Sequence, residues 1–251
     1  MVRNYLRTVG RHFSALFPPA CAGCDGVAAT GLAFCAVCAP VAHRIQEPCC
    51  SRCQVPMDLF RPTGANSLCS RCQRQPPAFD SVHALWEYDG SVADAIRRIK
   101  YGGDLPALRA LCRGASPWLS QRLSKLGPDL PVIPVPAHPA DLQRRGFHLP
   151  SLALRFLSLP NPIVTGGLRK QRPTPRQATL ALEERHRNLI DAFRWHGPSV
   201  AAKTALLFDD VLTTGATADA ASRALKLAGF DSVHIFVFAR APFISGSKPA
   251  T

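Results

Sequence analysis

Two adjacent carboxylates, Asp209 and Asp210, stand between a short apolar run and a turn of small residues. The apolar run, residues 205–208, predicts a buried strand of a parallel sheet. The turn consists of Thr213, Thr214, Gly215, Ala216 and Thr217. Because a glycine-containing turn at a helix start gathers free N–H groups, it predicts a cradle for one phosphate group, with the threonine hydroxyls as further donors.

The two carboxylates need a partner other than that phosphate, which they would repel. Hydroxyl groups or a divalent cation suit them better. A ligand with a phosphate at one end and vicinal hydroxyls beside it meets both demands, and a 5-phosphorylated ribose is such a ligand. The alternative is an ordinary βα turn that begins with two solvated acids, but adjacent carboxylates at a buried strand end are electrostatically unfavourable without a partner.

Eight of the ten cysteines predict a structural zinc module. They form the pairs Cys21/Cys24, Cys35/Cys38, Cys50/Cys53 and Cys69/Cys72. A Cys-x-x-Cys pair directs two thiolates at one ion, and two pairs complete a tetrahedral Zn–S₄ site that leaves no open position for chemistry. We therefore expect one or two structural Zn²⁺ ions, with redox-active disulfides as the alternative.

The ligand pairing stays open at this stage. Sequential pairing gives two sites in chain order, a cross-braced arrangement would interleave them, and Cys49 could replace its neighbour Cys50. Cys112 lies in an apolar helical stretch, which predicts a buried free thiol. Exposed arginines would let the module contact nucleic acid, and these are Arg44, Arg52, Arg71 and Arg74.

Composition points to an anionic partner. The 251 residues carry a formal net charge of +13, which favours binding of phosphates, nucleic acid or a membrane surface. No apolar run approaches the roughly 20 residues that span a bilayer, so we expect no transmembrane segment. Paired cysteines without a secretory apolar segment predict a cytoplasmic protein.

The chain divides into three predicted regions. Residues 1–20 predict an amphipathic helix, residues 21–78 the zinc-binding module, and residues 79–251 an α/β domain. Within that domain we expect strands at 82–88, 131–136 and 205–208, and helices at 91–102, 105–123, 150–157 and 218–227. This alternation predicts an open parallel sheet flanked by helices, with the site at the carboxyl ends of the strands.

Basic residues predict further anion contacts beside this site. Lys100 ends a helix at a glycine turn, where a solvated helix end is the alternative. His138, Arg144 and Arg145 lie in the loop after the strand at 131–136, which predicts a second anion site facing the first. The basic segment 168–187 suits a mobile lid over a polyanion, or else a basic linker.

The segment from Asp209 to Thr217 resembles the phosphoribosyl pyrophosphate (PRPP) signature of type I phosphoribosyltransferases. The resemblance implies that the turn holds the 5-phosphate of PRPP, and that Asp209 and Asp210 are the catalytic acids that hold the ribose hydroxyls, directly or through Mg²⁺. It also implies a phosphoribosyltransferase-like sheet. Lys100, Arg144 and Arg145 complete the expected PRPP-binding set, with the arginines on the pyrophosphate side.

The whole chain resembles the ComF (ComFC/GntX-like) family of bacterial competence-related proteins. The matching pieces include the four cysteine pairs, Lys100-Tyr101-Gly102, Arg144-Arg145-Gly146-Phe147 and the Asp209–Thr217 segment. The resemblance implies a cytoplasmic role in natural transformation, with incoming single-stranded DNA and other competence proteins as partners. The family usually continues Arg-Gly-Phe with Asn-Gln, whereas His148 and Leu149 follow here.

Two functions are compatible with these patterns. The first is an enzyme that displaces pyrophosphate from PRPP and transfers ribose 5-phosphate to an acceptor that the sequence does not identify. The second is a non-catalytic PRPP-sensing or nucleic-acid-binding adaptor. The sequence predicts no particular oligomeric state.

Overall fold

The computed structural model describes residues 19–57, 67–127, 130–137, 139–171, 192–198 and 202–242. The helix expected at residues 1–20 falls almost wholly outside these ranges. So do His138 and the larger part of the expected lid, residues 172–187. Within the described ranges, no helix is both long enough and apolar enough to cross a membrane.

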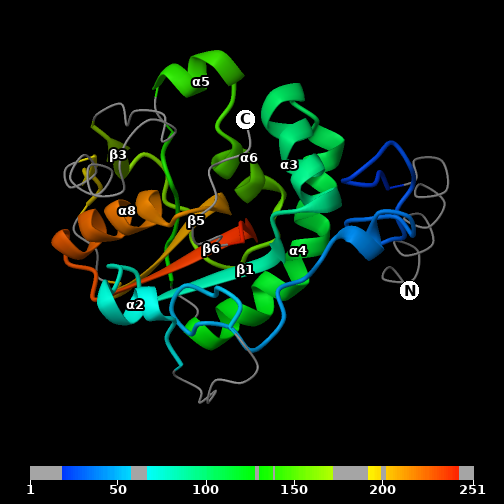
Figure 1. The fold of residues 1–251 in the computed structure, drawn as a ribbon. Coiled ribbons are helices and arrows are strands. Elements are labelled where there is room, and N and C mark those ends of the chain that lie inside the picture. Colours follow the sequence, from blue (N-terminus) through cyan, green and yellow to red (C-terminus); the bar gives the residue numbers. More distant parts are fainter. Residues whose placement is uncertain are drawn as a thin grey trace, which may run out of the picture.

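A four-stranded parallel sheet forms the centre of the molecule (Figure 1). Its order is β1 (Ser81–Glu87), β6 (Ser232–Arg240), β5 (Thr204–Leu212) and β2 (Val132–Pro134), and every neighbouring pair runs parallel. The strands are continuous apolar runs because helices cover both faces of the sheet. The expected open parallel sheet flanked by helices is confirmed.

The helices divide between the two faces. One core joins α3 (Gly90–Gly102), α4 (Leu105–Leu126) and α6 (Leu149–Phe156) to the stacked rings of Phe208 and Phe236. The other core places α8 (Ala216–Leu227) against the opposite face. Figure 1 shows α8 on one side of the sheet and α3 with α4 on the other.

Five small elements complete the described fold. They are η1 (Ala39–Val41), α2 (Ser70–Arg74), α5 (Pro139–Arg145) and an antiparallel pair, β3 (Leu168–Lys170) with β4 (Phe193–Trp195). The sequence did not predict that pair. Strand β3 occupies the first three residues of the basic segment 168–187 that was expected to be a lid, and β4 lies beyond the end of that segment. The three residues of β3 therefore belong to a strand rather than to a loop.

Strand β5 is longer than expected and contains both acids. The predicted strand ended at Phe208 because carboxylates interrupt the apolar pattern. The pairing with β6 nevertheless continues, with Asp209 opposite Val237 and Leu212 opposite Arg240. Backbone pairing thus extends the strand past the apolar run. Helix α8 likewise begins at Ala216, two residues earlier than expected.

The zinc module packs directly on the sheet domain. Its first half joins the core on the α3 and α4 side, where the rings of Phe34 and Trp86 meet edge to face at 5.7 Å. Its second half joins the core on the α8 side through Cys50, Cys53 and Cys72. The expected domain boundaries after residues 20 and 78 stay a prediction.

Candidate phosphate-binding site and zinc centres

The two acids of β5 differ in their partners. Lys100, at the end of α3, places its Nζ 2.6 Å from Oδ2 of Asp210. The side chains of Lys100 and Asp210 are only 19% and 11% exposed, so Lys100 does not form the solvated helix end considered above. Asp209 instead accepts the N–H of Asp210 at 2.9 Å through Oδ1.

This arrangement separates the ionisation of the two acids. Burial, and next the negative charge of Asp210, raises the pKa of Asp209 to about 8. Burial also opposes the positive charge of Lys100, but the Asp210 carboxylate outweighs it and raises the pKa of Lys100. At neutral pH, Asp209 is therefore largely protonated beside a tight Lys100–Asp210 ion pair.

The turn after β5 has the backbone that the sequence indicated. Gly215 has φ +78°, in the left-handed region that glycine adopts without strain, and it caps the N-terminus of α8. Its carbonyl accepts the N–H of Asp219 at 2.8 Å. The hydroxyl of Thr214 accepts the N–H of Ala216 at 3.4 Å. The turn is thus a structured helix start beside the two acids.

Two adjoining cavities open beside these acids. The first, of about 260 Å³, contains Asp209, Asp210 and Thr217 in its wall, with Arg145, His148 and Lys170 on other sides. The second, of about 370 Å³, is lined by residues at the end of α3 and the end of α5, among them Lys100, Arg144 and Arg145. Arg144 and Arg145 lie at the end of helix α5 rather than in the loop that the sequence predicted. Arg145 lines both cavities, so this basic end of α5 lies beside the acids, and the second anion site stays a prediction.

The side chain of His148 contacts the backbone that follows β2 rather than projecting freely. Its Nε2 lies 2.9 Å from the carbonyl of Val135 and 3.2 Å from the N of Ala137. Its Nδ1 lies 2.7 Å from the hydroxyl of Ser151. Burial lowers the pKa of His148 and keeps the ring neutral at pH 7. A histidine thus makes backbone contacts at the position where the ComF pattern has an amide.

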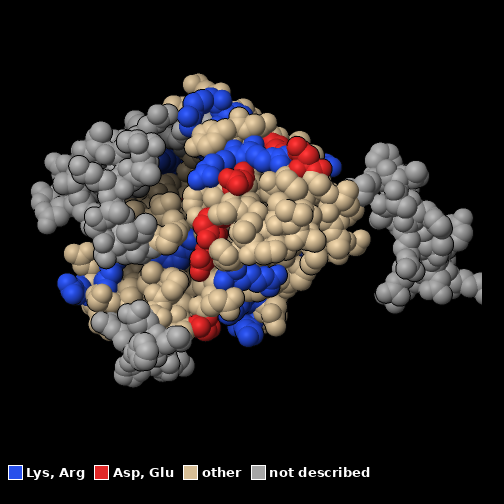
Figure 2. All heavy atoms as spheres, turned by 45° about the vertical axis from the view of Figure 1, so that its right-hand side comes forward, with Lys and Arg blue, Asp and Glu red and all other residues tan. Residues whose placement is uncertain are grey.

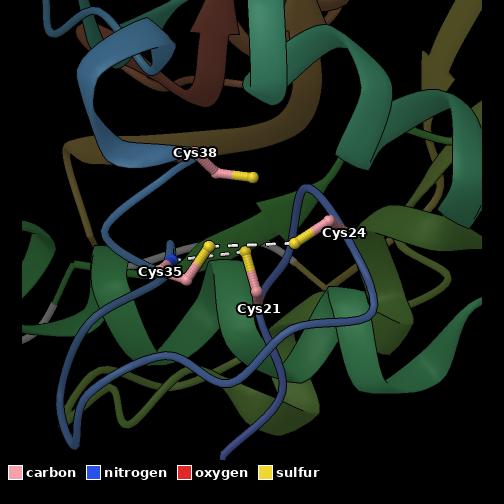
Figure 3. A group of neighbouring side chains, drawn as sticks. All are labelled: Cys21, Cys24, Cys35 and Cys38. Atoms are coloured by element: carbon pink, nitrogen blue, oxygen red, sulfur yellow. Dashed lines mark hydrogen bonds between the residues drawn. The ribbon is translucent and has the colours of Figure 1, made fainter.

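Two groups of four cysteines each fit one zinc ion. The sulfur atoms of Cys21, Cys24, Cys35 and Cys38 lie within 4.8 Å of one another, as do those of Cys50, Cys53, Cys69 and Cys72. Figure 3 shows the first group. Backbone N–H groups donate to the sulfurs of Cys21, Cys24 and Cys50 at 3.3 Å, as suits thiolate ligands. The residues present therefore fit two structural Zn²⁺ ions.

This geometry settles the pairing. The two sites form in chain order, so the cross-braced alternative is wrong. Cys49 stays outside the second group and its sulfur lies 3.2 Å from Oε2 of Glu47. Cys112 is a fully buried free thiol, as expected, and burial raises its pKa.

Two arginines that the sequence did not assign to the site contact the turn. Arg71, expected to be an exposed residue of the zinc module, donates from Nη1 to the Thr214 carbonyl at 2.8 Å. Arg240 donates from Nη1 to the Thr213 carbonyl at 3.3 Å and from Nη2 to the sulfur of Cys53 at 3.8 Å. No local pattern marks Arg240, because it is simply the last residue of an apolar strand.

The amino-acid sequence of this chain is similar to those of several known proteins. The double zinc ribbon domain family matches residues 13–76. Competence protein F of Haemophilus influenzae is 27% identical over 222 residues, which cover 79% of this chain and 93% of that protein. The DNA utilization protein YhgH of Shigella flexneri is 28% identical over 211 residues, covering 82% of this chain and 90% of that protein.

Solved structures give weaker likenesses. Adenine phosphoribosyltransferase of Saccharomyces cerevisiae is 16% identical with a TM-score of 0.33, covering 66% of this chain and 80% of that chain. A hypoxanthine phosphoribosyltransferase of Staphylococcus aureus is 15% identical with a TM-score of 0.33, covering 54% of this chain and 73% of that chain. These scores are too low to carry an argument. The sequence comparisons confirm the expected resemblance: the chain is similar to competence protein F and to the YhgH proteins, and its N-terminal part matches the double zinc ribbon domain.

Proposed function

We propose that this protein binds PRPP in the two adjoining cavities at the carboxyl ends of β5 and β2. The observation that carries the proposal is the pairing of a left-handed glycine turn at a helix start with two inequivalent acids in one cavity. The turn suits the 5-phosphate, and the acids suit the ribose hydroxyls beside it. Arg145 stands between the two cavities, where the pyrophosphate of the same ligand would extend.

Each residue has a proposed role in holding this ligand. Lys100 fixes the carboxylate of Asp210, and Asp210 then accepts a hydroxyl of the ribose in a set direction. Asp209, with its raised pKa, is neutral until a cation or a set of hydroxyls favours its charged form. The oxygen donors of Asp209 and Asp210 would hold the Mg²⁺ that accompanies PRPP, and the ion would supply that positive charge.

We further propose that the protein is a phosphoribosyltransferase. The bond between C1 of the ribose and the pyrophosphate oxygen breaks through an oxocarbenium-like transition state. Pyrophosphate departs as the leaving group. A nucleophilic atom of the acceptor bonds to C1 and loses its proton to solvent. Arg144 and Arg145 stabilise the negative charge that develops on the leaving group. The acceptor is the component that no residue identifies.

The biological role we propose is the handling of internalised DNA in the cytoplasm. The relatives named above carry the names competence protein and DNA utilization protein. The net charge of +13 favours a polyanion, and Figure 2 shows Lys and Arg side chains in both the upper and the lower parts of one face, with acidic side chains between them. Single-stranded DNA is therefore the proposed macromolecular partner, alongside other competence proteins.

The test is a calorimetric titration of PRPP with Mg²⁺ into the zinc-loaded protein. An Asp209→Ala/Asp210→Ala variant should lose binding, whereas Asp231→Ala, which replaces an exposed acid remote from the cavities, should keep it. A folded wild-type protein that does not bind PRPP would contradict the proposal.

A second assay decides between the enzyme and the PRPP-sensing adaptor. Pyrophosphate release is measured with PRPP, Mg²⁺ and candidate acceptors, including single-stranded DNA. Release that needs Asp209 supports the transferase. PRPP binding without pyrophosphate release for any acceptor favours the adaptor. The observation that motivates this alternative is that His148 contacts the backbone at the position where the family has an amide.

A further inference from the structure

The second zinc ribbon contacts the proposed phosphate turn through two arginines. Arg71 lies in α2 between the ligands Cys69 and Cys72, and it donates to the carbonyl of Thr214. Arg240 lies at the end of β6, and it donates both to the carbonyl of Thr213 and to the sulfur of Cys53. Two consecutive carbonyls of the turn are thus held from the zinc side.

Holding these carbonyls also sets the direction of the turn's donors. In a planar trans peptide, the C=O and the following N–H point in opposite directions. The N–H groups of Thr214 and Gly215 therefore point away from the arginines. Among the hydrogen bonds of the described residues, neither of these N–H groups is a donor. Both are available to an anion on the side opposite the zinc ribbon.

Arg240 is a buried cation that lies beside the second zinc centre. Its side chain is only 4% exposed, and no ion pair joins it to a carboxylate within the described parts of the chain. An isolated buried guanidinium would be strongly unfavourable. Four thiolates around one Zn²⁺ carry two net negative charges, and Cys53 brings one of those thiolates to Arg240. The zinc centre therefore supplies the counter-charge.

Packing alone does not fix this side of the turn. A cavity of about 470 Å³ lies between the ribbon and the turn, lined by Arg71, Arg240, Phe79, Leu212 and Gly215 among others. Because this cavity adjoins Gly215 and Thr214, the turn has room to shift toward the ribbon. The arginine contacts are what oppose such a shift.

We infer that the second zinc ribbon is part of the anion site, and that Arg71 and Arg240 are positioning residues that orient the N–H groups of the turn. Zinc at Cys50, Cys53, Cys69 and Cys72 is then required for an ordered turn. Zinc at the first site is not required for an ordered turn, because the first ribbon packs on the opposite face of the sheet. In naming the phosphate of PRPP as the anion, the inference rests on the proposed function.

The test compares Arg71→Gln with Arg74→Gln on the zinc-loaded full chain, because both residues belong to α2 and Arg74 is exposed. Three quantities are measured: zinc per chain, amide hydrogen exchange in residues 212–218, and affinity for PRPP with Mg²⁺. Arg71→Gln should keep both zinc ions, speed exchange in the turn about tenfold and weaken PRPP binding about tenfold, as the loss of one charged hydrogen bond implies. Arg74→Gln should change none of the three, and Arg71→Lys should restore part of the loss.

Two outcomes separate this inference from the proposed function. If the wild type fails to bind PRPP but Arg71→Gln still speeds exchange in the turn, the proposed function fails and the positioning role stands. If Arg71→Gln keeps its zinc and the exchange of the turn is unchanged, the positioning role is overturned whatever the PRPP result. Cys24→Ser removes a ligand of the first zinc site, and Cys69→Ser removes a ligand of the second. Equal effects of the two variants on amide exchange in the turn would also overturn the positioning role.

Discussion

Asp209→Asn and Asp210→Asn should change stability in opposite directions, although they are the same substitution at adjacent positions. Asp210 is the ion-pair partner of Lys100, at 2.6 Å. Among the described residues no ion pair involves Asp209, and burial beside Asp210 raises its pKa to about 8. Replacing Asp209 removes an unfavourable acid, whereas replacing Asp210 leaves a buried lysine without its counter-ion.

The magnitude for Asp209 follows from linkage. An aspartate in the unfolded chain has a pKa of about 3.9, and each unit of difference corresponds to about 1.36 kcal/mol. The folded pKa is the higher one, so the cost to folding is absent below about pH 4, grows as the pH rises, and levels off near pH 8. At pH 7 the upper limit is roughly 4 kcal/mol. Because Asp209 borders a cavity open to water, we expect Asp209→Asn to gain about 1–2 kcal/mol.

The magnitude for Asp210 follows from its partner. Removing one member of a fully buried ion pair costs about 3–5 kcal/mol. Lys100 and Asp210 keep some exposure, 19% and 11%, so water recovers part of that cost. We expect Asp210→Asn to lower the free energy of unfolding by about 2 kcal/mol.

The assay is urea denaturation of the zinc-loaded protein at pH 5 and pH 8, followed by circular dichroism. Asp209→Asn should raise the free energy of unfolding more at pH 8 than at pH 5, and Asp210→Asn should lower it at both. Asp231→Asn is the matched control, since Asp231 is 69% exposed and its change should stay within about 0.5 kcal/mol. A destabilised Asp209→Asn at pH 8, or equal shifts in the two variants, would refute the reasoning.

Three further experiments test other parts of the site. Gly215→Ala should cost about 1 kcal/mol through its positive φ and also weaken PRPP binding, whereas Gly166→Ala, with the same φ of +78°, should cost as much in unfolding but leave PRPP affinity unchanged. His148→Ala should lower unfolding free energy by about 1–2 kcal/mol, and His148→Asn by less, since an amide in the place of Nδ1 can still bond the hydroxyl of Ser151. Thiol modification should release two zinc ions per chain with loss of tertiary structure, and release of one ion would exclude a filled second site.

The sequence predicted the elements of this fold better than the contacts between them. Apolar runs and helical periodicity placed β1, β2, α3, α4, α6 and α8 within a few residues, because each pattern is local. Two strands are exceptions. Strand β6 was not predicted, and the last residues of β5 are held by pairing with β6 rather than by an apolar pattern. Cysteine spacing identified the ligands but not their pairing, since both arrangements satisfy the same spacing.

The contacts that complete the site join segments distant in sequence, and this is why the motif alone did not reveal them. The segment from Asp209 to Thr217 indicates a phosphate turn with two acids, but it does not show which acid forms an ion pair with a lysine. That distinction comes from Lys100, more than a hundred residues earlier. The turn's orientation depends in the same way on Arg71 and Arg240. A zinc ribbon attached to a sheet domain can look like an independent module in sequence, yet here one of its knuckles supplies a donor to the turn. Truncation at the expected boundary after residue 78 should therefore weaken PRPP binding even if the sheet still folds, and retention of full affinity by a folded truncated chain would show that the ribbon does not support the site.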